Sequence, residues 1–157
     1  GRKYKKRECY IPAKYLKPIS KKTPIHKPTK IDELISYANK LIGTPYVRNG
    51  KTAKGLDCSN FVAYCFKHIG IQLPTSLSGL ARTTKNMVRI ESILKAKRGD
   101  LLFFSSDTSD TVSHTGIYIG NSRIIHASEV AGKVVISDLT DYYTRNFCYI
   151  LRYDSTD

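Results

Sequence analysis

The order of two hydrophobic patterns constrains the fold of this chain more than any other feature of its sequence. Apolar residues recur at helical spacing between residues 31 and 69, whereas short apolar or alternating runs typical of strands occupy residues 101–152. Helices that precede strands, instead of alternating with them, indicate an α+β fold. We therefore predict N-terminal helices packed on an antiparallel sheet of five to six strands.

Two amphipathic helices are predicted in the first half of this region. The first covers residues 31–42, and Thr29 with Asp32 three positions later has the pattern of a capping box. A loop punctuated by glycines follows over residues 43–55. The second helix covers residues 57–69, and its apolar residues form one stripe that we expect to be buried.

Five strands are predicted after an irregular or short helical stretch at residues 74–87. Short connections that contain Gly, Asn and Ser separate most of them, which favours antiparallel pairing. The strands are expected at residues 101–104, 114–119, 123–127, 133–137 and 147–152.

The net charge of +13 is concentrated in one segment. Residues 1–30 contain eleven Lys and Arg and one acid, a net charge of +10, whereas residues 31–157 contain fifteen Lys and Arg and twelve acids, a net charge of +3. Four prolines in residues 1–30 oppose a continuous helix. We predict a basic arm or linker over 1–30 and a compact domain over 31–157. A solvated tether is the simpler interpretation of the arm, and binding to an anionic wall polymer or membrane surface is the alternative.

The chain has the length of one ordinary domain. No apolar run approaches the ~18–20 residues of a membrane-spanning helix. Residues 1–7 are followed by no apolar stretch long enough for a signal peptide.

The four cysteines are Cys9, Cys58, Cys65 and Cys148. No CxxC pair occurs, which argues against a structural zinc site. Cys58 and Cys65 are about two helical turns apart, too far for a disulfide. Free thiols are the simplest interpretation, with Cys65 and Cys148 as buried apolar residues, and the disulfide state of Cys9, Cys65 and Cys148 stays open.

Cys58 is the candidate nucleophile. It follows a Gly-rich loop and lies at the predicted start of a helix, where backbone N–H groups and the helix dipole favour a thiolate. The same N–H groups could donate to an oxyanion when a carbonyl is attacked. On position alone, a structural buried cysteine is an equally good interpretation.

His114 and His126 lie on consecutive predicted strands joined by a tight turn. If the hairpin is centred on Gly120, residue 114 lies opposite residue 126, and the two imidazoles are neighbours on one face. A register with an odd sum of residue numbers would place them on opposite faces, so the hypothesis requires a three- or five-residue connection or an equivalent bulge.

A nucleophilic cysteine with two adjacent histidines has a simple mechanistic interpretation. His114 acts as general base and His126 fixes the tautomer and orientation of His114. A zinc site formed by Cys58, His114 and His126 is the chemical alternative, and it explains the helix-start position of Cys58 less well. His26 in the arm and His68 near a helix end are expected to be structural.

Five sequence blocks resemble, in order, the signature blocks of the NlpC-type cell-wall cysteine peptidases. The resemblance covers roughly residues 31–152, and such blocks are specific when they occur together at this spacing. The blocks are GTPY at 43–46, LDCSNFV at 56–62, RGDLLFF at 98–104, SHTGIYIG at 113–120 and IHAS at 125–128.

The resemblance implies a papain-like fold and hydrolysis of peptidoglycan stem peptides, typically between γ-D-glutamate and the diamino acid. It also implies that Cys58 is the nucleophile, His114 the base and His126 the orienting third residue. Tyr46 aligns with a family tyrosine beside the nucleophile that helps to shape the oxyanion or substrate site. A half-buried loop aromatic is the competing interpretation of Tyr46.

Three further polar residues flank the implied site and are weaker candidates for substrate contacts: Asp57, Ser59 and Ser113. Asp57 could equally serve only as the helix cap. The sequence also departs from the family pattern. Residues 47–50 (VRNG) stand where an aromatic and two glycines are frequent, Asn60 stands where a glycine is usual, and an arginine often seen after the proline of residues 73–76 is absent. These departures concern substrate detail and leave the implied triad intact.

The sequence therefore predicts a cysteine peptidase of the bacterial cell envelope (secreted, periplasmic or lipid-anchored) that uses a thioacyl-enzyme and no metal or cofactor. We expect a monomer. Two alternatives stay open: a non-catalytic wall-binding module, which would not need a thiolate, and an amidase or acyl transferase on the same fold. Nucleic-acid binding is not expected, because the charge is confined to the arm and the body lacks interleaved basic and aromatic residues.

Overall fold

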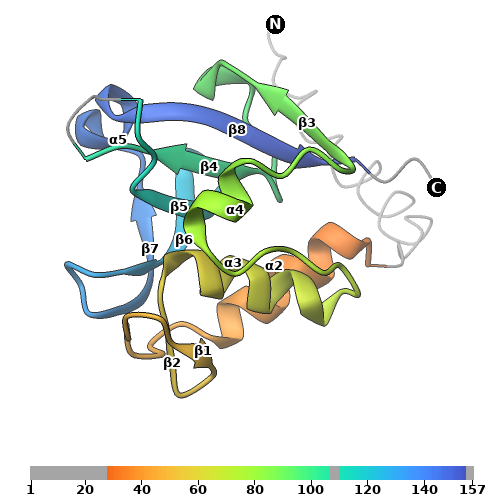
Figure 1. Ribbon diagram of the computed structural model, residues 1–157, viewed down its shortest axis with the longest axis vertical. Coiled ribbons are helices and arrows are strands. Elements are labelled where there is room, and N and C mark those ends of the chain that lie inside the picture. The colour runs from red at the N-terminus through yellow and green to blue at the C-terminus, as the bar shows by residue number, and fades with distance from the viewer. Residues whose placement is uncertain (1–27, 107–109, 155–157) are drawn as a thin grey trace, which may run out of the picture.

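A computed structural model describes residues 28–106 and 110–154 of the chain. Helices α2 (Lys30–Lys40) and α3 (Cys58–His68) pack against each other, and α3 contacts β5 and β6 of a six-stranded antiparallel sheet (Figure 1). The sheet order is β3-β8-β4-β5-β6-β7. Its strands are β3 (Met87–Ile90), β4 (Leu101–Phe104), β5 (His114–Gly120), β6 (Arg123–Ser128), β7 (Lys133–Asp138) and β8 (Phe147–Tyr153). The predicted α+β fold, with helices packed on an antiparallel sheet of five to six strands, is confirmed.

Shorter elements complete the fold, and sequence patterns missed most of them. They are the hairpin of β1 (Lys51–Thr52) and β2 (Gly55–Leu56), the helices α4 (Leu77–Ala81) and α5 (Asp141–Arg145), and the 3₁₀ turn η2 (Ile93–Lys95). The stretch expected to be irregular or helical up to Met87 contains α4, but it ends in β3, which pairs with β8. This pairing joins segments some 60 residues apart, and local patterns carry no signal for it.

The predicted arm over residues 1–30 lies outside the described residues up to residue 27. At the start of the described region, Thr29 and Asp32 form the expected capping box. The Asp32 backbone N–H donates to Thr29 Oγ1 at 3.1 Å, and the Thr29 backbone N–H donates to Asp32 Oδ2 at 3.0 Å. This reciprocal pair fixes the start of α2.

The core is divided by the sheet. On the helix side, the predicted stripe of α3 packs with residues of β5 and β6, including Phe61, Phe66, Ile117 and Ile125, all without solvent exposure. A smaller cluster around Leu102, Phe104, Ile124 and Ile150 lies on the other face. Alternate residues of β5 and β6 therefore face different clusters, so the strand register decides which side chains lie together.

A bulge sets the register of the β5–β6 hairpin. Asn121 and Ser122 both have positive φ angles (53° and 58°), as in a two-residue type I′ hairpin turn, and Gly120 pairs with Arg123. The register then shifts by one residue, so that Tyr118 pairs with Ile124. Without this shift the residue numbers of each pair would have an odd sum, and residues 114 and 126 would lie on opposite faces of the sheet.

The predicted register is wrong by two residues. Continuation of the Ile117–Ile125 pairing places Gly116, not His114, opposite His126. A Cβ atom on Gly116 would lie 2.9 Å from the Cβ of His126, which confirms how closely these positions face each other. His114 is thus the diagonal neighbour of His126 on the same face. His114 and His126 are therefore neighbours on one face, as predicted, and the bulge that this prediction required is present.

Candidate active site

Cys58 is the first residue of α3, and Asp57 caps the helix in front of it. Asp57 Oδ1 accepts hydrogen bonds from the backbone N–H and the side-chain amide of Asn60, at 2.9 and 2.8 Å. Asp57 Oδ2 accepts from the backbone N–H of Asn49 at 3.0 Å. The carboxylate therefore fixes the helix start and also ties the preceding loop to it.

Asn60 accounts for one departure from the family pattern. Its buried side chain donates to the capping carboxylate, which a glycine could not do. The departure thus reinforces the geometry around Cys58.

The Cys58 thiol is buried, and burial raises its pKa to about 11. Backbone hydrogen bonds from Thr115, Ser59 and Cys58 itself act in the opposite direction and lower the pKa. The backbone donors therefore favour the thiolate as predicted, but the predicted lowering of the thiol pKa is wrong because desolvation outweighs them. Before substrate binds, the sulfur carries its proton.

His114 and His126 are directly hydrogen-bonded. His114 Nε2 lies 2.7 Å from His126 Nδ1, and His126 Nε2 lies 2.8 Å from Ser137 Oγ on β7. The three side chains form a linear chain of polar atoms across three adjacent strands. Sequence reasoning missed Ser137. Val135 is the partner of His126 in the β6–β7 ladder, and Ser137 lies two residues further along β7, on the same face of the sheet. That shared face would have been its only signal.

Burial lowers the pKa of both imidazoles. The pKa of His114 falls to about 3 through desolvation and the neighbouring His126, and that of His126 falls to about 4 through desolvation. Both rings are therefore neutral at physiological pH. Each neutral ring has one N–H donor and one acceptor nitrogen, as a chain of hydrogen bonds requires.

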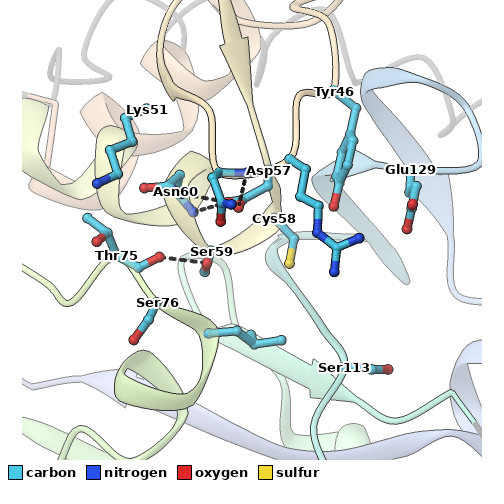
Figure 2. Close-up of a pocket in the computed structure, with 13 residues that line it drawn as sticks. Tyr46, Lys51, Asp57, Cys58, Ser59, Asn60, Thr75, Ser76, Ser113 and Glu129 are labelled. Carbon is cyan, nitrogen blue, oxygen red and sulfur yellow. Dashed lines mark hydrogen bonds between the residues drawn. The ribbon is translucent and has the colours of Figure 1, made fainter.

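A cavity of about 460 Å³ opens in front of Cys58, whose sulfur points into it (Figure 2). Tyr46 and Glu129 extend into the same space from one side, and Lys51 lies on the other side of Cys58. Burial and the nearby Cys58 raise the pKa of the Tyr46 phenol, which therefore stays a hydrogen-bond donor. Tyr46 is held in place because its backbone N–H donates to the Gly132 carbonyl at 2.8 Å.

A second cavity, of about 250 Å³, is lined by both histidines together with Tyr142 and Tyr143 of α5. Ser113 and Glu129 line both cavities and connect them. The thiol receives a backbone hydrogen bond from Thr115, the residue after His114. Within the described residues, no hydrogen bond joins the thiol to the His114 ring.

The structure thus brings the predicted residues to one place in two groups. Cys58, Tyr46, Asp57, Ser59 and Ser113 line the first cavity, whereas His114 and His126 line the second with Ser113 between them. The Ser59 hydroxyl donates to the Thr75 carbonyl at 2.7 Å, which orients it toward the protein.

Sequence reasoning assigned no role to several residues that line these cavities. They are Arg48, Lys51, Thr75, Glu129, Tyr142 and Tyr143. They come from loops, from the two-residue strand β1 and from the short helix α5, and hydrophobic patterns say little about such segments.

Other candidates are separate from this site. The His68 ring stacks on Tyr37 with centroids 3.8 Å apart, a structural role as expected, and His26 lies outside the described residues. Cys58, Cys65 and Cys148 are free thiols, and Cys9 also lies outside the described residues.

The described residues contain no group of three or more His, Cys, Asp or Glu side chains suited to hold a metal ion. Within residues 28–106 and 110–154, no helix has the length and apolar character to cross a bilayer.

Comparison with known proteins identifies the family. The sequence profile of the NlpC/P60 family matches residues 43–152, which is well over half of the chain and includes every residue of both cavities. The chain therefore belongs to the NlpC/P60 family.

Individual relatives agree with this assignment. The chain is 37% identical over 111 residues to a probable endopeptidase NlpC homolog of Haemophilus influenzae, covering 70% of this chain and 55% of that protein. It is 38% identical over 125 residues to a gamma-DL-glutamyl hydrolase of Bacillus subtilis, covering 78% of this chain and 29% of that protein. The chain thus spans about half of the first relative and less than a third of the second.

The fold is similar to that of an NlpC/P60 family protein from Bacillus cereus ATCC 10987, known from its crystal structure. The TM-score is 0.72 at 28% sequence identity, with 82% of this chain and 42% of that chain covered.

Proposed function

We propose that this chain is a cysteine peptidase that hydrolyses peptidoglycan stem peptides, at the bond between γ-D-glutamate and the diamino acid. The observation that carries the proposal is the arrangement of a thiol at a capped helix start beside two hydrogen-bonded, neutral imidazoles. Family membership and the similarity to a gamma-DL-glutamyl hydrolase support the choice of substrate.

The histidine chain favours one set of proton positions. If His114 Nε2–H donates to His126 Nδ1, then His126 carries its proton on Nε2 and donates to Ser137 Oγ. This arrangement leaves His114 Nδ1 as the unprotonated nitrogen. In the proposed mechanism Nδ1 is the atom that accepts the thiol proton, and His126 holds the ring in that tautomer.

Attack and proton transfer take place together in this mechanism. Because the thiol pKa lies well above that of His114, no stable thiolate–imidazolium pair precedes substrate binding. As the sulfur adds to the scissile carbonyl carbon, His114 Nδ1 takes its proton. His114 is not hydrogen-bonded to the thiol in the free protein, so substrate must bring the two groups into reach, as is common for catalytic contacts.

The tetrahedral intermediate then collapses to a thioester. The C–N bond breaks, and the proton held by His114 passes to the departing amine. Water, deprotonated by His114, adds to the thioester carbonyl carbon. The C–S bond then breaks, the carboxylic acid product leaves, and the proton held by His114 returns to the sulfur. Backbone N–H groups at the start of α3 and the protonated Tyr46 hydroxyl are the proposed donors to the oxyanion in both steps.

The test is mass spectrometry of a defined stem peptide, L-Ala-γ-D-Glu-diamino acid-D-Ala, incubated with the protein. We expect the wild type to cleave only the γ-D-glutamyl bond, and Cys58→Ala and His114→Ala to abolish cleavage. Cys148→Ala is the matched control, because that free thiol lines neither cavity and should be dispensable.

The other outcomes each name a different function. Transfer of the acyl group to an added amine, with little hydrolysis, would replace the peptidase by an acyl transferase. Cleavage of an amide outside the stem peptide would indicate an amidase. Binding to peptidoglycan without Cys58-dependent chemistry would indicate a wall-binding module and would contradict the proposal.

We propose that the protein acts in the bacterial cell envelope, whether secreted, periplasmic or lipid-anchored, because its proposed substrate lies there. We also propose that it acts as a monomer. The basic arm is proposed to act as a tether or to contact anionic wall polymers or a membrane surface. Its residues 1–27 lie outside the described residues, so this role rests on charge alone.

A further inference from the structure

The Cys58 cavity carries charged side chains that the protein itself does not neutralise. Arg48, Lys51 and Glu129 line it, and none of the three has an ion-pair partner among residues 28–106 and 110–154. The Asp57 carboxylate also lines the cavity, but its two oxygens already accept three hydrogen bonds from the protein. Among the described residues, the cavity therefore contains two cations without an ion-pair partner, Arg48 and Lys51, and one such anion, Glu129.

Arg48 is the cation best placed to act on a substrate. It follows the Tyr46–Val47 segment and lines the same cavity as Tyr46 and Cys58. It also belongs to residues 47–50 (VRNG), which stand where the family often has an aromatic and two glycines. Arg48 thus lies in a loop that adjoins the nucleophile.

The loop that carries Arg48 is rigidly held. Gly50 N–H donates to the Val47 carbonyl at 2.8 Å, and Asn49 donates its backbone N–H to the Asp57 cap. A Cβ atom on Gly50 would lie 2.4 Å from the Gly55 carbonyl oxygen, so the loop closes tightly on the β1–β2 hairpin. The base of the Arg48 side chain is thus fixed relative to Cys58, although Arg48 as a whole is exposed.

The positions of the two cavities determine the direction in which the substrate binds. In the proposed mechanism His114 protonates the leaving amine, so the leaving group occupies the cavity lined by the histidines and Tyr142–Tyr143. The acyl-donating residue then occupies the Cys58 cavity, beside Arg48. Lys51 adds positive potential on the side of Cys58 away from Glu129 (Figure 2).

We propose that Arg48 recognises a free carboxylate on the acyl-donating residue of the substrate, with Lys51 adding to the positive potential. The protein then discriminates against substrates in which that carboxylate is a neutral carboxamide. A guanidinium suits this role because it presents two parallel N–H donors to a carboxylate. The inference deepens the proposed function and rests on it for the direction of the substrate.

The test uses two peptides that differ in a single group: L-Ala-γ-D-Glu-diamino acid, with a free α-carboxylate, and the same peptide with D-isoglutamine. We expect wild-type kcat/KM to favour the carboxylate peptide by about 30-fold, in the range of a charge-assisted contact. Arg48→Gln should reduce this preference to about threefold, Arg48→Glu should invert it, and Lys51→Gln should reduce it by about threefold.

Lys54→Gln is the matched control. Lys54 is an exposed cation between β1 and β2 that does not line the cavity, so its removal should leave the preference unchanged. Equal cleavage of both peptides by the wild type would overturn the inference and leave the proposed function standing. An equal loss of preference in Lys54→Gln would also overturn it, since the effect would then be one of overall charge.

A binding measurement separates this inference from the proposed chemistry. Cys58→Ala protein cannot form the thioester, and its affinity for the two peptides can be measured by calorimetry. We expect tighter binding of the carboxylate peptide, and loss of this preference in Cys58→Ala/Arg48→Gln. That result would support the inference even if the wild type cleaves neither peptide and the proposed function fails. Equal affinities for the two peptides would overturn it.

Discussion

The nucleophile side and the histidine side of the site are built in different ways. On the nucleophile side, Asp57, Cys58 and Asn60 are near neighbours in sequence, and one carboxylate organises the helix start and the adjoining loop. On the histidine side, His114, His126 and Ser137 come from three strands and meet only through a hairpin bulge and sheet register. Local hydrogen bonds thus place the thiol, whereas long-range pairing places the base.

The largest expected difference between the two sides is their response to acid. The histidines have pKa values near 6.5 when unfolded and about 3 and 4 when folded. Between these values the unfolded chain binds more protons, so the histidine contribution to stability is complete above pH 6.5 and is lost as the pH falls toward 3. We expect the free energy of unfolding to drop by a few kcal/mol, on the order of 1.4 per pH unit and group.

Urea unfolding at pH 7, 5.5 and 4.5 measures this effect. In His126→Gln one of the two titrating rings is gone, and the stability should fall less steeply with acid than in the wild type. The Cys58 thiol should not contribute, because with a pKa of about 11 it stays neutral throughout this range. Parallel slopes for the two proteins would mean that carboxylates, not the buried imidazoles, control acid unfolding.

The second prediction breaks the histidine side without touching a titrating group. In Gly116→Ala the new methyl group meets the His126 Cβ at 2.9 Å and displaces that strand or its side chain. We expect kcat to fall about 100-fold, or about 2.7 kcal/mol, because small misplacements of catalytic groups are costly. KM should change less than kcat, since the Cys58 cavity, which takes the acyl-donating residue, is intact.

Gly70→Ala provides the control for this experiment. Gly70 has a φ of +84° and no atom near its missing Cβ, so alanine there costs about 1 kcal/mol in stability through backbone strain alone. It lies just beyond α3, at the end far from Cys58. A similar fall of kcat in both variants would show that general destabilisation, not His126, is responsible.

The third prediction targets the nucleophile side. Asp57→Ala removes three hydrogen bonds at the start of α3, and we expect a loss of about 1–2 kcal/mol in the free energy of unfolding at pH 7. Asp57→Asn keeps a capping oxygen and should recover most of that loss. Equal stability of the two variants in urea would show that capping is not what Asp57 provides.

The same contrast explains what could be predicted from the sequence. The helices, the five main strands and the position of Cys58 depend on local patterns, and these predictions hold. The adjacency of His114 and His126 was also predictable, but not their register. The bulge at the end of β5 lies next to the turn at Asn121 and Ser122, where both φ angles are positive, and no hydrophobic pattern encodes it.

What sequence patterns missed depends on distant partners. β3 is recognisable only through its pairing with β8, and Ser137 only through its place beside His126. The thiol pKa was predicted in the wrong direction, because the helix start is visible in the sequence whereas the burial of the sulfur is not. Site residues from loops, such as Arg48, also could not be recognised from the sequence, because only the tertiary structure places them beside Cys58.

The smallest expected effect belongs to the far end of the histidine chain. Ser137→Ala removes the hydroxyl 2.8 Å from His126 Nε2, so the tautomer of His126, and through it that of His114, is less strictly fixed. Because water can replace the hydroxyl at this partly exposed position, we expect kcat to fall only about fivefold, near 1 kcal/mol, with KM unchanged. Ser137→Thr should restore kcat, since it returns a hydroxyl. If threonine failed to restore kcat, or if KM rose as kcat fell, Ser137 would have only a packing role. The hydrogen-bonded groups that position His114 would then end at His126.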